Sequence, residues 1–268
     1  MKLTVISHFY NEAFLLPYWL SYHTKLFDHG ILVNYDSTDN SVDIIKKLAP
    51  HWEVRNSKNR VWDFIEADQE VMDIEREVDG WKIVLNTTEF ILHNNLKAYL
   101  HDFKKRNPEL LGVRTNGIVM VDKLEDRYKK MGEEHLIYQK KYGYLESDYA
   151  PITPANPLHR SRFIHHAPNG KYTLGRHQTS YPSFIDKKLF LLWFGFCPFE
   201  YLKARKLSFK NRLSARNINI GAGLQHTWDE EQLEAAFIKE SSRSYNLLEK
   251  VPEYKEALNQ IKHDFNEL

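Results

Sequence analysis

Residues 3–40 read LTVISHFYNEAFLLPYWLSYHTKLFDHGILVNYDSTDN, and they contain two strand-like runs separated by a helical stretch. Apolar residues dominate 3–9 and 30–35. In 11–27 the hydrophobic residues recur every three or four positions, as on one face of a helix, with Asn11 placed to cap it. This unit therefore predicts a strand, a helix and a second strand parallel to the first.

The same alternation continues to residue 122. Helices are expected over 36–49, 63–78 and 92–106, and strands over 52–56, 81–85 and 110–122. Repetition at this spacing predicts an α/β fold with a mostly parallel sheet flanked by helices. Ligands of such sheets bind at the carboxyl ends of the strands.

The pattern weakens beyond residue 122. Residues 123–184 read largely as a polar covering loop, with two short strands expected on either side of the turn PNG at 168–170. The tail predicts two amphipathic helices that are broken near Pro252. We expect an α/β domain over 1–228, with halves at 1–122 and 123–228, and a helical C-terminal appendage over 229–268.

Composition excludes several classes of protein. The net charge of +1 does not favour a nucleic-acid partner, and a lone cysteine excludes an intramolecular disulfide framework. Cys197 is either a nucleophile or a buried thiol, and its aromatic neighbours in WFGFCPFEY favour the buried thiol.

The N-terminus shows no secretion signal, and no apolar run reaches the ~20 residues of a membrane span. We therefore expect a cytoplasmic protein. Residues 200–216 carry basic side chains with apolar ones between them. A helix of this kind either rests on the inner face of a membrane or packs its apolar side on the domain.

Polar residues follow the first two predicted strands. They are His8, Asn11 and Glu12 after the first strand, and Asn34, Asp36 and Asp39 after the second. Side chains of this kind either hydrogen-bond a ribose or nucleobase edge, or cap the helices that follow. The two groups become neighbours if their strands pair.

The order of SHFYNE (7–12), NYDSTDNS (34–41) and WKIVLNTTEF (81–90) resembles glycosyltransferase family 2. It is most similar to the branch that opens with His-x-x-Asn-Glu and has Ser-Thr-Asp after the second strand. The resemblance covers residues 1–95 well and 160–226 more faintly. It implies a GT-A fold, which is Rossmann-like, a nucleoside-diphosphate sugar donor, and transfer to a hydroxyl.

The resemblance also implies roles for single residues. Asn11 and Glu12 match the family motif near the nucleoside, and Asp39 matches the Asp of Ser-Thr-Asp. Asn34 stands where many members have an acidic residue that contacts the ribose or base, which leaves the choice of base open.

The family's metal-binding Asp-x-Asp motif is replaced here by Asn86 and Thr88, followed by Glu89. Mg²⁺ and Mn²⁺ prefer anionic oxygen ligands, and two carboxylates are missing. Either Asn86 and Glu89 hold a metal weakly, with His226 as a further candidate ligand, or the enzyme works without metal, or activity is lost. We favour metal-free action narrowly.

A metal-free enzyme needs cations for the leaving diphosphate. Residues 159–177 supply basic side chains, and the candidates for phosphate or acceptor contacts are Arg162, His166, Lys171, Arg176 and His177. The alternative is a solvated basic loop. An inverting transferase also needs a general base, for which we choose Asp148, while retention of configuration stays open.

The expected function is glycosyl transfer from a nucleotide sugar to a glycan or lipid-linked acceptor in surface polysaccharide synthesis. One alternative is a carbohydrate- or partner-binding protein that kept the fold without activity. A nucleotidyltransferase is less favoured because SHFYNEAF contains no glycine for a phosphate loop.

Overall fold

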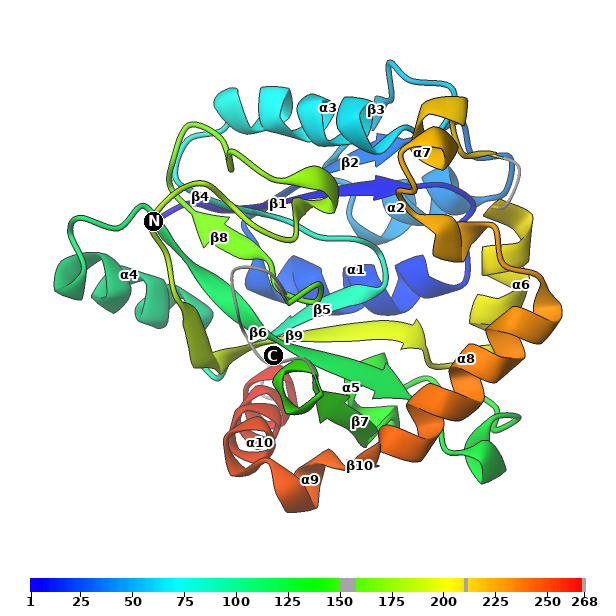
Figure 1. Ribbon diagram of the computed structural model, residues 1–268. Coiled ribbons are helices and arrows are strands. Elements are labelled where there is room, and N and C mark those ends of the chain that lie inside the picture. Colours follow the sequence, from blue (N-terminus) through cyan, green and yellow to red (C-terminus); the bar gives the residue numbers. More distant parts are fainter. Residues whose placement is uncertain (150–157, 210–211, 267–268) are drawn as a thin grey trace.

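The computed structural model describes residues 1–149, 158–209 and 212–266 of the chain. Its N-terminal part alternates strands and helices in the predicted order (Figure 1). The elements are β1 (Leu3–Phe9), α1 (Leu15–Leu26), β2 (His29–Asn34), α2 (Ser41–Leu48), β3 (Glu53–Asn56), α3 (Phe64–Arg76), β4 (Trp81–Val84), β5 (Glu89–Leu92) and α4 (Leu96–Arg106).

The second part is less regular. It contains β6 (Gly112–Val121), η1 (Leu124–Asp126), α5 (Leu136–Gln139), β7 (Tyr142–Leu145), η2 (Glu146–Asp148), β8 (Phe163–His165), η3 (Leu174–Arg176), β9 (Ile185–Phe196) and α6 (Phe199–Phe209). The chain continues through α7 (Ala215–Asn219), η5 (Leu224–His226), α8 (Glu230–Arg243), β10 (Tyr245–Asn246), α9 (Leu247–Lys250) and α10 (Pro252–Asn266). The break expected near Pro252 is therefore confirmed, since α10 begins at that residue.

The sheet has the strand order β10-β7-β6-β8-β4-β1-β2-β3, and β9 joins β6 to β5. Strands β3, β2, β1 and β4 are parallel to one another. Beyond β4 the sheet is mixed, because β8 runs antiparallel to both β4 and β6. The expected α/β fold is confirmed. The sheet is parallel only in its N-terminal half and at the β6–β9 pair, so the expectation of a mostly parallel sheet is corrected: β7, β8 and β10 and the β5–β9 pair add antiparallel pairings.

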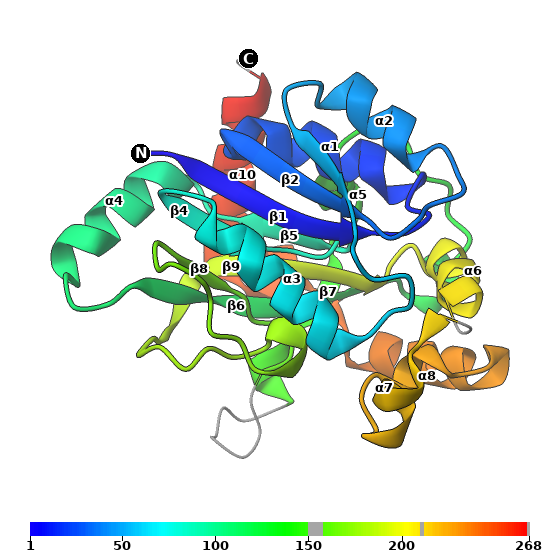
Figure 2. The same cartoon turned by 90° about the horizontal axis from the view of Figure 1, so that it is seen from above.

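Helices cover both faces of the parallel half. Val5 of β1 belongs to the larger core, where α1, α2, α4 and α10 pack. The adjacent Ile6 points to the opposite face and packs in a smaller core with Val71 of α3. Figure 1 and Figure 2 show α3 and α1 on opposite sides of β1. The C-terminal helix α10 packs in the larger core, and the division of the chain at residue 228 stays a prediction.

The first helix starts later than predicted. Asn11 does not cap α1, because its backbone is left-handed, with φ of 51°, and α1 begins at Leu15 after Phe14. The side chain of Asn11 instead accepts hydrogen bonds from the backbone N–H groups of Thr38 and Asp39. Pro17 is the third residue of the helix, where the missing N–H has no helical partner to lose.

The hairpin expected around PNG is only partly formed. Its first strand is β8, but the described residues after Gly170 form the short helix η3 rather than a second strand. A single bridge between Tyr172 and Thr179 closes this loop. The loop is held instead by α3, whose Glu75 accepts hydrogen bonds from the backbone N–H of Gly170 and the hydroxyl of Tyr172.

The basic stretch 200–216 does not form a single amphipathic helix. Helix α6 ends at Phe209, and two of its cations form ion pairs with other elements. Lys203 pairs with Glu230 and Glu234 of α8, and Arg205 pairs with Glu12. The structure therefore does not support a membrane contact through this stretch. Within the described ranges, every helix is too short or too polar to cross a bilayer.

Candidate active site

A cavity of about 300 Å³ opens at the carboxyl ends of β1, β4 and β9. Helices α6, α7 and α8 lie beyond these strand ends in both views (Figures 1 and 2). Five cationic side chains line the cavity, namely Arg160, Arg162, Arg176, Arg205 and Lys206. Three carboxylates also line it, those of Glu12, Glu89 and Glu240. The excess of cations favours an anionic ligand.

Glu89 lies at the centre of the site and is fully buried. Its carboxylate accepts two hydrogen bonds from the Arg162 guanidinium, from Nε at 3.0 Å and from Nη2 at 2.6 Å. Asn86 donates two more, from its backbone N–H and its side-chain amide, both at 2.9 Å. Four donors thus occupy both oxygens of Glu89.

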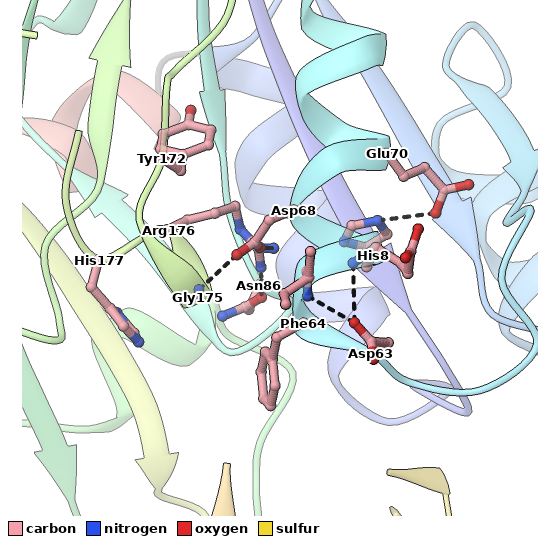
Figure 3. Close-up of polar contacts among 12 residues, drawn as sticks. His8, Asp63, Phe64, Asp68, Glu70, Asn86, Tyr172, Gly175, Arg176 and His177 are labelled. Atoms are coloured by element: carbon pink, nitrogen blue, oxygen red, sulfur yellow. Dashed lines mark hydrogen bonds and ion pairs between the residues drawn. The ribbon is translucent and has the colours of Figure 1, made fainter. Parts of the chain in front are cut away.

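The other face of Asn86 is also engaged (Figure 3). Its carbonyl oxygen accepts a hydrogen bond from Nη2 of Arg176 at 3.0 Å. Arg176 pairs in turn with Asp68 of α3 at 2.5 Å, and Asp68 accepts a further bond from the backbone N–H of Gly175. The turn at η3 thereby places a guanidinium beside the strand end that carries Asn86.

These contacts do not fit a divalent cation. The oxygens of Asn86 and Glu89 that would coordinate a metal already accept hydrogen bonds from Arg176 and Arg162. A metal between them would lie against two guanidinium groups, whose charge opposes it. His226 does not complete a set of ligands, since no three His, Cys, Asp or Glu side chains converge on such a site within the described ranges.

Two cavity cations have no carboxylate partner among the described residues. The guanidinium of Arg160 lies flat over the ring of Trp193, at 3.7 Å from its centre, and its Nε is buried without a hydrogen-bond partner. Lys206 of α6 lies near the rings of Trp193 and Phe196. Burial, followed by the charges of Arg205 and Arg160, lowers the pKa of Lys206 to about 7.

Two histidines at the cavity wall, His177 and His226, are held neutral. Burial, followed by the charge of Arg162, lowers the pKa of His177 to about 2. Burial and the charge of Lys206 lower the pKa of His226 to about 3. Neither imidazole therefore supplies positive charge at neutral pH, although both line the cavity. Thr88 lines it as well, and its carbonyl accepts a hydrogen bond from the backbone N–H of Phe194.

His8 reaches the cavity from the end of β1 (Figure 3). Its side chain is 1% exposed, and its Nε2 lies 3.6 Å from a carboxylate oxygen of Glu70. Burial lowers the pKa of His8 despite this neighbour. Tyr35 and Trp62 contact the ring edge to face, so His8 is fixed in position with neither nitrogen in a hydrogen bond.

The remaining strand-end residues shape loops. Glu12 lines the cavity and pairs with Arg205, with Nε at 2.6 Å. Asn34 and Asp39 lie outside the cavity wall, and both accept hydrogen bonds from backbone N–H groups, of Ser37 and of Ala13. Asp36 adopts a left-handed turn conformation, with φ of 63°, and is exposed. Asn11 also lies outside the cavity wall, so Asn11, Asn34 and Asp39 hold loop backbone in place and neither cap α1 or α2 nor line the cavity.

Three predicted site residues lie elsewhere in the molecule. Asp148 is exposed, accepts a hydrogen bond from the hydroxyl of Tyr245, and does not line the cavity. His166 packs against Trp81, and Lys171 is exposed with its ammonium over Tyr181. These positions follow from pairings between distant segments, which local sequence does not specify.

Cys197 is also outside the site. Its thiol is buried, contacts Asp122 at 3.2 Å, and has its pKa raised well above the usual value by burial. This confirms the buried thiol that the aromatic neighbours predict.

Sequence reasoning missed Lys206, Trp193 and Glu240 as cavity residues. Lys206 was assigned to the basic stretch over 200–216, and Glu240 to an amphipathic helix of the tail. Of these three residues, only Trp193 could have been found from local sequence. It is followed two positions later by Gly195, and the absence of a side chain there lets the Trp193 ring lie against the strand. A Cβ added at Gly195 would lie 1.9 Å from that ring.

No family model matches the chain, and no curated protein is similar to it. Among solved structures, residues 1–349 of S. aureus TarS share 14% identity over 97% of this chain and 80% of that one, with a TM-score of 0.41. The same protein in complex with UDP-GlcNAc is 13% identical over 97% and 80%, with a TM-score of 0.39. HddC from Yersinia pseudotuberculosis is 13% identical over 75% of this chain and 97% of that one, with a TM-score of 0.37.

Proposed function

We propose that the protein is a glycosyltransferase that binds a nucleotide-sugar donor in this cavity. The sugar moves to a hydroxyl of a glycan or lipid-linked acceptor. The observation that carries the proposal is the pair of cations without carboxylate partners, Arg160 and Lys206, inside a cavity at the carboxyl ends of parallel strands.

The cavity has distinct parts that suit such a donor. Aromatic side chains lie at the end near β1, where a nucleoside ring can stack on them. They are Tyr10, Trp62, Phe64 and Phe209. The unpaired cations lie by Trp193, where they can contact phosphate oxygens through charge-assisted hydrogen bonds.

We propose that these cations do the work that a divalent metal does in other enzymes. As the bond between sugar and diphosphate breaks, negative charge grows on the leaving oxygen. Arg160 and Lys206 stabilise that charge more than they stabilise the intact donor, which lowers the barrier. Arg162 and Arg176 contribute less, because Glu89 and Asp68 already neutralise them.

Calorimetry with a panel of UDP-GlcNAc, UDP-glucose, GDP-mannose, dTDP-glucose and CMP-sialic acid tests the proposal. We expect at least one donor to bind, with an affinity that changes less than threefold between 1 mM EDTA and 1 mM MnCl₂ (about 0.7 kcal/mol). The variants Arg160→Met and Lys206→Met should each weaken binding about tenfold or more, since each removes a charged contact. Lys171→Met, which changes an exposed lysine outside the cavity, is the matched control.

Different results separate the parts of the proposal. Failure of every donor to bind would overturn the glycosyltransferase assignment. Binding that needs Mn²⁺ would overturn only its metal-free form. Binding without consumption of donor, in the presence of alkyl glycoside acceptors, would favour the carbohydrate-binding protein that kept the fold without activity.

A further inference from the structure

Glu240 brings a carboxylate into the cavity from α8, far along the chain from the residues considered so far. The hydroxyl of Tyr144, on β7, donates a hydrogen bond to its Oε2. Arg243, one turn along α8, approaches the same oxygen at 3.5 Å. These contacts all involve Oε2, so the other oxygen, Oε1, has no hydrogen-bond or ion-pair partner within the part of the chain that the structure describes.

The three carboxylates that line the cavity differ in how they are held. Glu89 accepts two hydrogen bonds from one guanidinium, and Glu12 lies 2.6 Å from Nε of Arg205. Both are buried to within 1% exposure, and Oε2 of Glu12, which has no hydrogen-bond partner among the described residues, is buried as well, whereas Glu240 is partly exposed. Glu240 has only the longer contact with Arg243 and a neutral hydroxyl as neighbours.

Strand register places Glu240 at the far end of the cavity from Glu89. Glu89 pairs with Trp193, Trp193 with Val119, and Val119 with Tyr144, across β5, β9, β6 and β7. Residues paired directly across strands point to the same face of a sheet. Three steps between strands span ~14 Å, so the backbone at Tyr144, whose hydroxyl contacts Glu240, lies about that far from the backbone at Glu89.

On the basis of the proposed function, we propose that Glu240 is the general base that takes the proton from the acceptor hydroxyl. The hydroxyl oxygen forms a bond to the anomeric carbon while the bond from that carbon to the diphosphate oxygen breaks. The bonding pair leaves with the diphosphate, beside Arg160 and Lys206. The hydroxyl proton moves to Oε1 of Glu240, and Tyr144 acts as a positioning residue that holds Oε2.

The test uses the donor that calorimetry selects from the panel, with octyl glucoside, octyl galactoside or water as acceptor, and measures release of nucleotide. Glu240→Gln keeps an oxygen for the Tyr144 hydroxyl. We expect it to lower kcat by about 100-fold or more while donor affinity changes less than threefold. The fall of kcat toward acid pH in the wild type should be absent from this variant.

Matched variants separate a base from a structural contact. Glu231→Gln, an exposed carboxylate on the same helix, should leave kcat unchanged. Tyr144→Phe should lower kcat less than tenfold and shift the acid limb of the pH profile, because the carboxylate remains but loses its donor. Glu240→Asp keeps a carboxylate on a shorter side chain and should recover part of the activity that Glu240→Gln loses. It also replaces Glu240→Gln as the test variant if Glu240→Gln folds poorly.

Two results would overturn the assignment. One is a Glu240→Gln variant that binds donor and turns it over within threefold of wild type, with the acid limb intact. The other is a wild-type protein that binds donor yet releases no nucleotide with any of these acceptors. If no donor binds at all, the proposed function itself fails, and calorimetry shows this before any kinetic measurement.

Discussion

Arg162 and Glu89 form a buried ion pair with two hydrogen bonds, and each side chain is no more than 3% exposed. Glu89 follows directly on the strand end where the family resemblance predicts a metal. The structure uses it instead to hold a guanidinium that also donates to the carbonyl of Ser161. Removal of one partner from such a pair is costly, because the other charge stays buried without compensation.

Glu89→Ala should therefore lower the free energy of unfolding by about 3–5 kcal/mol. The double variant Glu89→Leu with Arg162→Met, which removes both charges, should recover at least half of this loss. Urea unfolding followed by circular dichroism measures both. A loss below about 1 kcal/mol in Glu89→Ala would show that Glu89 does not hold Arg162 in the way described.

Donor affinity should depend on pH through Lys206. Its pKa of about 7 means that the ammonium form, which attracts phosphate, dominates below pH 7 and disappears above it. We expect affinity to fall about tenfold from pH 6 to pH 8.5, the effect of one charged contact. His177 and His226 are already neutral throughout this range, because their pKa values lie at about 2 and 3.

Calorimetry with a nucleotide sugar measures this pH dependence. A nucleotide sugar is chosen over a nucleoside diphosphate because the diphosphate has a terminal phosphate that itself titrates. Lys206→Arg keeps its charge through this range and should bind equally well at both pH values. Lys206→Met should bind weakly at both. A wild-type affinity that is flat from pH 6 to pH 8.5 would contradict the assignment of Lys206 to the phosphate site.

Gly195→Ala should displace the Trp193 ring and with it Arg160. The added Cβ would lie 1.9 Å from the ring, so the ring must rotate away from its strand, and the guanidinium stacked on it loses its support. We expect a stability loss of about 1–3 kcal/mol and a several-fold weaker donor affinity. Gly132→Ala is the control, because its nearest neighbouring atom would lie at 3.6 Å. Equal donor affinity in Gly195→Ala and wild type would show that the ring does not position Arg160.

The protein should lose stability on mild acidification through His23. This side chain is fully buried, and its Nδ1 lies 2.9 Å from the carbonyl of Trp19. Burial lowers its pKa to about 3, whereas an unfolded histidine titrates near 6.5. The unfolded state binds the extra proton, so stability is complete above pH 6.5 and falls between pH 6.5 and pH 3.

At pH 5 the loss from this one group is about 2 kcal/mol. Urea midpoints at pH 7.5 and pH 5 measure it. His23→Asn, whose amide can donate to the same carbonyl, should show a smaller difference between the two pH values than wild type. The same difference in both proteins would assign the acid sensitivity to other buried histidines.

Much of the fold follows from local pattern. The strands β1, β2 and β4 and the helices α1, α2 and α3 were each expected, because an apolar period of two or of three to four residues depends only on neighbours in the chain. The start of α1 was predicted too early, at Asn11. The side chain of Asn11 accepts a hydrogen bond from the backbone N–H of Thr38 in another loop instead of capping the helix.

The residues of the candidate site also separate into those that local sequence predicted and those that it did not. Of the residues expected there, His8, Glu12, Asn86, Thr88, Glu89, Arg162, Arg176, His177 and His226 line one cavity. Position at the end of a predicted strand explains several of these, because parallel strands end at one edge of the sheet. Asp148, His166 and Lys171 were placed there on side-chain type alone, and the packing of distant segments puts them elsewhere.

The sequence alone determined that an α/β sheet ends in polar loops, that the predicted strand 81–85 is followed by Asn86, Thr88 and a single carboxylate at Glu89, and that cations gather within residues 159–177. These are properties of short stretches. Only the tertiary structure decided that Arg162 neutralises Glu89, that Arg160 and Lys206 have no carboxylate partner among the described residues, and that Glu240 reaches the cavity. The physical reason is that the charge state and role of each group depend on which partner lies within ~3 Å, and those partners come from segments about 50–200 residues apart.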